Sequence, residues 1–121
     1  MAARLGPDEW LLIGPERDDA TFVFAAAADL PDRVFSLVEV SHRNAALTVS
    51  GPGACAVLNA GIALDLSDAA FPAGSATRTL LGKAEVILLR PGAAPLYQVE
   101  CWRSFAPYVH GLLTEVVQEF A

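Results

Sequence analysis

Charged residues are few in this chain of 121 residues: Asp, Glu, Lys and Arg make up 18% of it, against 54% hydrophobic residues. The 8 Lys and Arg residues stand singly, and the formal net charge is -6. Binding to phosphates requires clustered cations, which excludes a nucleic-acid partner and disfavours an anionic membrane surface. Roughly a quarter of the residues of a typical soluble domain are charged. We therefore expect part of the apolar surface to contact another protein.

Cysteine and histidine are also scarce, with two residues of each. Cys55 and Cys101 lie far apart in apolar surroundings, which favours buried free thiols over a redox pair. The histidines have no Asp, Glu or Cys at ligand spacing, so a structural zinc site is not expected. Asp65 and Asp68 are spaced like calcium ligands, but the rest of that loop pattern is missing. We assign these two carboxylates a turn or capping role.

Long hydrophobic runs are absent. No apolar run approaches the ~20 residues that span a bilayer, and the N-terminus lacks the apolar core of a signal peptide. The sequence therefore predicts a cytoplasmic protein without membrane segments. Its length is typical of one domain, so we treat residues 1–121 as a single unit.

The remaining pattern predicts an α+β fold with helices packed on an antiparallel or mixed sheet. Strands are expected from alternation and from branched and aromatic residues at 9–13, 34–40, 46–49, 77–81, 85–89 and 96–102. The second and third of these runs are close enough to suggest antiparallel pairing. Helices are expected at 15–30, at 54–64, and from an N-cap at Ser104 to the end of the chain.

The Gly-Pro-Gly stretch at 51–53 can be read as an anion-binding loop or as the start of a helix. A phosphate loop needs several converging N–H groups, yet Pro52 removes one of them and no Lys follows. We therefore expect a helix start, with Ser50 or Gly51 as the N-cap and Pro52 in the first turn. Gly61 is expected to end this helix in a left-handed conformation.

Catalytic residues cannot be assembled into a set. Ser41 and His42 are adjacent, and neighbouring residues of a strand point to opposite faces, so they make a poor nucleophile–base pair. Cys55 falls at a helix start, where a thiolate is stabilised, but its apolar neighbours favour an inert thiol. We expect no catalytic, cofactor-binding or metal residue in this chain. An enzyme that uses Cys55 or His42 is the least favoured alternative.

Basic and aromatic side chains among apolar neighbours are typical anchors for the carboxylates and carbonyls of a partner protein. An equally weighted alternative is that the basic residues serve solubility and pair with Glu85 or Glu100. The candidate interface residues are His42, Arg43, Arg78, Lys83, Trp102 and Arg103.

Three stretches together resemble the gamma subunit of heterotetrameric sarcosine oxidase, a bacterial flavoenzyme complex. They are EVSHRNAALTVSGPGACAVLNAGIALDL, FPAGSATRTLLGKAEVILLR and VECWRSFAPYVHGLL. The likeness runs from about Gly6 to the C-terminus, and this chain looks short at its N-terminus relative to the family. The stretch from Val40 to Gly53, followed by Leu64-Asp65-Leu66 and Pro72-Ala73-Gly74, is also similar to the amino-terminal folate-binding region of the glycine cleavage T protein, which implies a shared fold.

The resemblance implies a non-catalytic structural subunit that packs against the alpha subunit of a complex with alpha, beta and delta chains. That complex oxidatively demethylates sarcosine, an oxidoreductase reaction on a CH–NH group in sarcosine catabolism and one-carbon metabolism. FAD, FMN, NAD and tetrahydrofolate are expected in the complex, and none of them on this chain. An open sheet edge at the short N-terminus suggests a homo-oligomer when the chain is isolated. The alternative function is a stand-alone protein that binds folate or one-carbon units.

Overall fold

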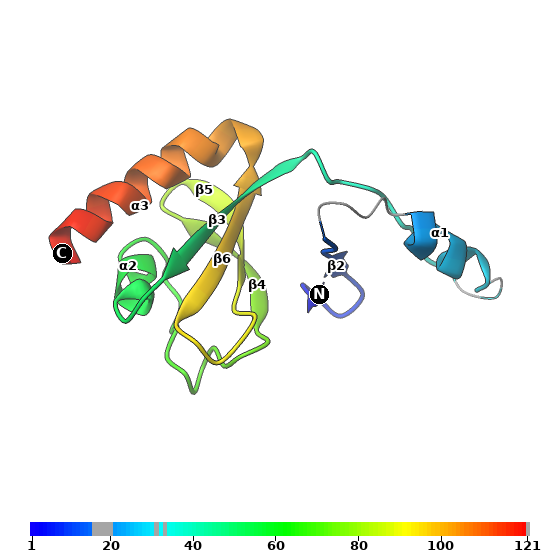
Figure 1. Cartoon of the computed structure of the whole chain (residues 1–121), viewed down its shortest axis with the longest axis horizontal. Coiled ribbons are helices and arrows are strands. Elements are labelled where there is room, and N and C mark those ends of the chain that lie inside the picture. The colour runs from blue at the N-terminus through cyan, green and yellow to red at the C-terminus, as the bar shows by residue number, and fades with distance from the viewer. Residues whose placement is uncertain (16–20, 31, 33, 121) are drawn as a thin grey trace.

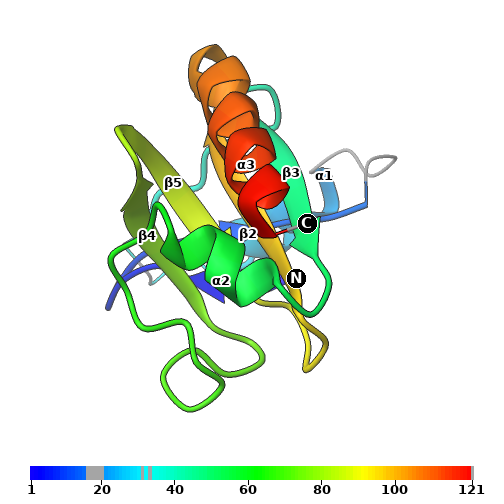
Figure 2. The ribbon, with the colours of Figure 1, turned by 90° about the vertical axis from the view of Figure 1, so that its left-hand side faces the viewer.

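A computed structural model of the chain describes residues 1–15, 21–30, 32 and 34–120. An antiparallel sheet of four strands, in the order β3-β6-β5-β4, forms its centre. These strands are β3 (Asn44–Ser50), β4 (Ala76–Leu81), β5 (Ala84–Leu89) and β6 (Leu96–Trp102). Helices α2 (Ala54–Asn59) and α3 (Ala106–Phe120) cover one face of the sheet, and the N-terminal strands lie behind it (Figures 1 and 2). The predicted α+β class is confirmed.

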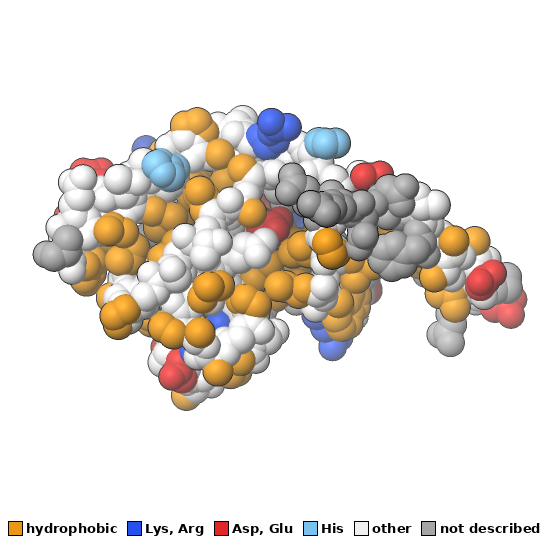
Figure 3. Space-filling view, in the orientation of Figure 1, with side chains coloured by type: hydrophobic (Ala, Val, Ile, Leu, Met, Phe, Trp, Pro, Cys, Tyr) orange, Lys and Arg blue, Asp and Glu red, His pale blue; other side chains and the backbone are white. Residues whose placement is uncertain are grey.

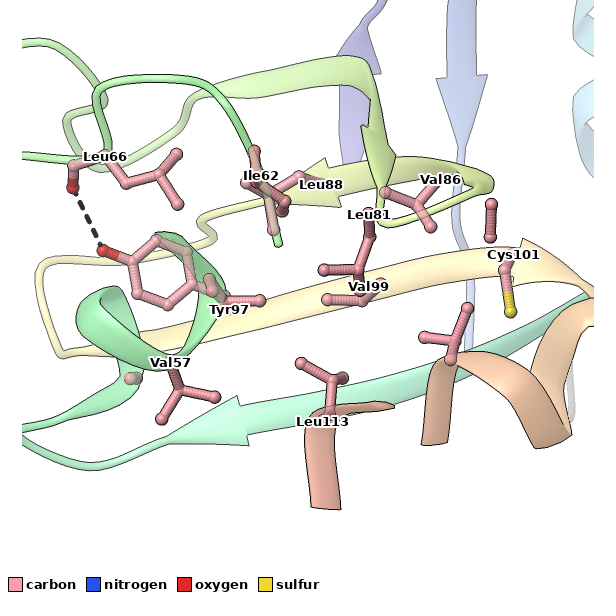
Figure 4. Close-up of a cluster of buried hydrophobic side chains, with 14 of the residues drawn as sticks. Val57, Ile62, Leu66, Leu81, Val86, Leu88, Tyr97, Val99, Cys101 and Leu113 are labelled. Atoms are coloured by element: carbon pink, nitrogen blue, oxygen red, sulfur yellow. Dashed lines mark hydrogen bonds between the residues drawn. The ribbon is translucent and has the colours of Figure 1, made fainter. Parts of the chain in front are cut away.

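The main core lies between the sheet and the two helices. Strand β6 alternates as its sequence predicts: Tyr97, Val99 and Cys101 are each no more than 2% exposed and point toward the helices. Leu58 from α2 and Val109 from α3, both fully buried, meet them from the other side. Figure 4 shows this cluster, with the Tyr97 hydroxyl donating to the Leu66 carbonyl at 3.5 Å. Burial of these side chains removes apolar surface from water and holds the two layers together.

A second, smaller cluster lies on the opposite face of the sheet. Strands β1 (Ala2–Arg4) and β2 (Trp10–Leu12) pair antiparallel and bring Ala3 against Ile87 and Leu89 of β5. The sequence predicted β2 but not β1. A run of three residues is too short to show a pattern that predicts a strand. Strand β1 forms because it pairs with β2 and packs against the sheet.

The turn between β4 and β5 is the two-residue loop Gly82-Lys83, with Leu81 opposite Ala84 in the register. Gly82 has a φ of +59°, the left-handed conformation that such a tight hairpin requires. A Cβ atom here would overlap the Tyr108 hydroxyl and lie 2.9 Å from Leu112 Cδ2. The glycine therefore serves both the turn and the close approach of α3.

Three details of the helix ends differ from expectation. The N-cap of α2 is Gly53, so Pro52 precedes the helix, and the backbone N–H of Gly51 donates to the Pro95 carbonyl. Helix α2 ends at Asn59, before Gly61. Gly61 does not have a positive φ, and a Cβ atom on it would lie 2.6 Å from Leu81 Cδ1. Close packing, not backbone conformation, explains that glycine. Ser104 lies in a 3-10 turn, η1 (Arg103–Phe105), which precedes α3 and has no side-chain cap.

Residues 34–40 do not form a strand in the described part of the chain, and the expected pairing with β3 is wrong. Strand β3 pairs with β6, from Asn44 opposite Trp102 to Ser50 opposite Leu96. Alternation indicates that a segment suits a strand, but a strand also needs a neighbour for its backbone hydrogen bonds. The helix expected at 15–30 is confirmed as α1 (Thr21–Ala28), while residues 16–20 lie outside the described residues.

Candidate functional site

Five of the six candidate interface residues lie at one end of the sheet. His42 and Arg43 belong to the turn that leads into β3, while Trp102 and Arg103 close β6. Lys83 joins them because β5 begins where β6 ends: Val86 lies opposite Cys101, so the β4–β5 turn projects at the same end. The antiparallel order of the strands thus gathers residues that are up to sixty positions apart in the sequence.

Backbone hydrogen bonds fix this end of the sheet. The Arg103 N–H donates to the Arg43 carbonyl at 3.1 Å, which joins the two turns. The Lys83 N–H donates to the Tyr108 hydroxyl at 3.0 Å and ties the β4–β5 turn to the first turn of α3. The basic side chains therefore project from a rigid base, which lowers the entropy lost when a partner binds them.

Aromatic side chains lie beside these basic groups. Trp102 is 57% exposed, and its ring centroid is 6.4 Å from that of Phe105. Phe105 and Tyr108 are also largely exposed. The sequence analysis missed these two as interface residues because the 3.6-residue period of α3 assigned them to the core. Exposed aromatics next to arginine are typical of the centre of a protein–protein interface. We call Trp102, Arg103, Phe105 and the His42-Arg43 turn the sheet-end surface.

Arg78 lies apart from the sheet-end surface, in the edge strand β4. Its guanidinium forms ion pairs with Glu9 and, at 3.4 Å, with Glu85. The pair with Glu9 connects the β1–β2 loop to β4. Pairing with Glu85 was the alternative to an interface role for this arginine, and the structure supports that alternative.

Glu100 is buried on the β1–β2 side of the sheet and receives hydrogen bonds from two amides. Asn44 Nδ2 donates to Oε2 at 3.2 Å, and Gln98 Nε2 donates to Oε1 at 2.7 Å. No cation is paired with it among the described residues, so of the two acidic partners considered for the basic residues, Glu85 and not Glu100 forms an ion pair. Two amide donors satisfy the carboxyl and order strands β3 and β6 relative to each other.

Arg90, which the sequence analysis did not single out, is 4% exposed and connects two loops, the one at 65–74 and the one between β5 and β6. Its Nη1 atom donates to the Phe71 carbonyl at 2.8 Å and lies 2.7 Å from Asp68 Oδ1, and Nη2 donates to the Ala93 carbonyl. The guanidinium carbon lies 5.6 Å from the centroid of the Tyr97 ring. Burial raises the pKa of the Tyr97 phenol, an effect that Arg90 partly offsets. The signal for Arg90 in the sequence was its position directly after four strand residues that are buried.

Ser41 and Cys55, two of the three side chains considered for catalysis, have other hydrogen-bond partners. The Ser41 hydroxyl donates to Glu39 at 3.1 Å, and His42 lies exposed in its turn. The Cys55 thiol is only half-buried, which corrects the expectation of a buried thiol, and it donates to the Leu66 carbonyl at 3.4 Å. Cys101 is buried as expected, and burial raises the pKa of its thiol. A thiol with a raised pKa is a poor nucleophile at neutral pH.

Turn roles account for the acidic residues of the loop at 65–74. Asp65 Oδ1 accepts a hydrogen bond from the Ser67 N–H at 2.9 Å, and this bond lowers the pKa of the Asp65 carboxyl. No group of three or more His, Cys, Asp or Glu side chains able to hold a metal occurs among the described residues. Within the same residues, no helix is long and apolar enough to cross a membrane.

Two hollows of the described surface differ in size and enclosure. The more enclosed one, between β1 and the end of β5, measures about 70 Å³, whereas ligand pockets usually measure roughly 300–1,000 Å³. The other measures about 460 Å³ and is an open depression over Arg78, Leu80 and Glu85.

The fold and this site define a small α+β protein with exposed aromatic and basic side chains at one end of its sheet. A model of the sarcosine oxidase gamma subunit family matches residues 2–119. The chain belongs to this family. It is 36% identical over 118 residues to sarcosine oxidase subunit gamma of Corynebacterium sp. (strain P-1) and 34% identical to that of an Arthrobacter species.

These alignments cover 97% of the chain but 56% of each relative, so the chain spans just over half their length. A solved structure, heterotetrameric sarcosine oxidase from Corynebacterium sp. U-96 in complex with pyrrole 2-carboxylate, superposes with a TM-score of 0.87. The sequence identity is 26%, and the superposition covers 98% of this chain and 60% of the matched chain. The resemblance inferred from the three sequence stretches is confirmed.

Proposed function

We propose that this chain is a structural, non-catalytic subunit of a heterotetrameric sarcosine oxidase-type complex and packs against its alpha subunit. The superposition on a chain of such a heterotetramer, which covers nearly all of this chain, carries the proposal. The arrangement of the described side chains agrees with it, because Ser41 and Cys55, two of the three side chains considered for catalysis, form hydrogen bonds to other groups. The complex would oxidatively demethylate sarcosine, with FAD, FMN, NAD and tetrahydrofolate held by the other subunits.

The sheet-end surface supports the docking role. Trp102 and Phe105 offer apolar area, and Arg43 and Arg103 offer planar guanidinium groups that can bind carboxylates or carbonyls of a partner in a bidentate manner. Their strands are joined by backbone hydrogen bonds, so the surface is ordered before a partner arrives. Such a combination gives affinity from the aromatic area and orientation from the charges.

Affinity purification of the tagged chain from its host tests the proposal. We expect alpha, beta and delta subunits to elute with the chain in constant proportion. The proposal fails if the chain elutes alone while alpha and beta subunits assemble without it. Trp102→Ala and Arg103→Ala each change a side chain of the sheet-end surface. These variants should reduce recovery of the partners without unfolding the chain.

Folate binding by the isolated chain remains the alternative, and the geometry gives it less support. Arg78 or Lys83 would meet the glutamate tail of folate, and Arg78 is already engaged by Glu9 and Glu85. Titration with tetrahydrofolate, followed through the fluorescence of Trp10 and Trp102, separates the two functions. Saturable quenching at micromolar ligand would favour the alternative, and an unchanged spectrum would remove it.

A further inference from the structure

Residues 21–30 and 34–40 form an apolar arm that projects away from the sheet and its helices (Figure 1). The arm consists of α1 followed, after Leu30, by the extended stretch 34–40. It contributes no residue to either hydrophobic cluster of the described chain. Its composition is nevertheless that of a buried element: α1 reads TFVFAAAA, with Thr21 as its one polar residue. A helix that is hydrophobic on all sides is normally enclosed by protein.

The extended part of the arm exposes large apolar side chains one after another. Val34 is fully exposed, and Phe35 and Val38 are 51% and 69% exposed. An exposed apolar surface of this extent on a charge-poor chain marks an interaction site. The backbone indicates the same: among described residues, no N–H group of 34–40 donates a hydrogen bond to another backbone carbonyl. This segment has the alternation of a strand and lacks only a neighbouring strand.

The arm lies largely within the part of the chain that a solved structure matches. The superposition on a chain of heterotetrameric sarcosine oxidase covers 98% of this chain, which leaves too few residues uncovered to omit the arm. The matched chain belongs to an assembly with other subunits. The arm also runs directly into the His42-Arg43 turn, which makes it continuous with the sheet-end surface.

We propose that the apolar arm is the main anchor of this chain on another subunit of the complex, where residues 34–40 add a strand to the edge of that subunit's sheet. This inference rests on the function proposed above. Asp29, Asp32 and Glu39 are exposed along the arm, so the receiving groove is apolar with basic residues at its rim. Hydrophobic and acidic side chains are visible together on the projecting arm in Figure 3. Main-chain pairing supplies affinity, and pockets for alternate side chains supply specificity.

The test compares two double variants of the full chain in co-purification and titration with the alpha and beta subunits. Phe35→Ser/Val38→Ser changes the arm, and Leu80→Ser/Val117→Ser changes equally exposed apolar residues of the body. Loss of two buried apolar side chains should weaken binding roughly 100-fold or more in the arm variant. The body variant should bind as the wild type does, and both variants should keep the wild-type thermal midpoint.

Hydrogen exchange provides a second measurement on the wild-type complex. Amides of residues 34–40 should exchange at least tenfold more slowly in the complex than in the free chain. Wild-type affinity in the arm variant, equal losses in both variants, or unprotected amides would overturn the inference while the proposed function stands. If the wild type binds neither subunit, the proposed function fails and the inference falls with it. An arm that instead mediates self-association would give a wild-type dimer, a monomeric arm variant and unchanged subunit binding, which also overturns it.

Discussion

Replacement of Gly82 by alanine should destabilise the chain by about 4 kcal/mol. The φ of +59° at this position costs an L-residue about 1–2 kcal/mol. The added methyl group would overlap the Tyr108 hydroxyl and lie 2.9 Å from Leu112 Cδ2, and overpacking of this kind costs about 1–3 kcal/mol. Movement of Tyr108 would also break its hydrogen bond from the Lys83 N–H, worth about 1 kcal/mol.

Urea denaturation followed by far-UV circular dichroism measures this effect. With a slope of about 2 kcal/mol per molar, the midpoint of Gly82→Ala should fall by roughly 2 M. Gly92→Ala is the matched control, because a Cβ there meets nothing within 4 Å; its change should stay within about 0.5 kcal/mol. Tyr108→Phe in the Gly82→Ala background should recover part of the loss by removing the overlapped oxygen. A Gly82→Ala variant as stable as Gly92→Ala would refute the conclusion that Gly82 is required by both the turn and the close approach of α3.

Four further predictions concern the core. Arg90→Met should lower the free energy of unfolding by about 2–4 kcal/mol in the same assay, because buried carbonyl acceptors lose their donor; a neutral effect would contradict its role. Leu88→Ala removes a fully buried side chain and should cost about 2–5 kcal/mol, and a loss below ~1 kcal/mol would be inconsistent with that burial. Iodoacetamide at neutral pH should label Cys55 at least about tenfold faster than Cys101, with mass spectrometry as the readout. Because burial raises the pKa of both Cys101 and Tyr97, the folded state keeps protons that the unfolded chain releases. Stability should thus be complete below about pH 8 and fall as pH rises through the folded values; constant stability from about pH 8 to 10 would contradict this.

Patterns with a fixed period allowed the centre of the fold to be predicted. The alternation of Tyr97, Val99 and Cys101 against Gln98 and Glu100 defines which face of β6 is buried, because one period decides the side of every residue. The β4–β5 hairpin was equally predictable from the sequence, because two apolar runs flank a two-residue turn whose first residue is glycine. The three helices follow from composition and periodicity, even where their caps differ from expectation.

What the sequence could not predict depends on partners distant in the chain. Strand β1 has no pattern of its own and exists through pairing with β2. The stretch 34–40 has the pattern but no partner among the described residues. Trp102, Arg103 and the His42-Arg43 turn of the sheet-end surface were predicted singly and Phe105 was not, and their assembly at one end required the strand order β3-β6-β5-β4. Arg78 was assigned to the same surface because a sequence does not show that Glu9 reaches it.

The low charge of this chain follows from where its apolar residues lie. The main core takes up side chains of the sheet, α2 and α3, and the β1–β2 ribbon takes up those of the opposite face. Neither accounts for Phe24, Leu30, Phe35 and Val38, which remain exposed on the arm. Selection for solubility of an isolated protein would replace such residues with charged ones, at little cost to a core they do not contact. Their retention is explained if the arm is normally enclosed by another subunit, and the body then needs only the stability that its own two clusters supply.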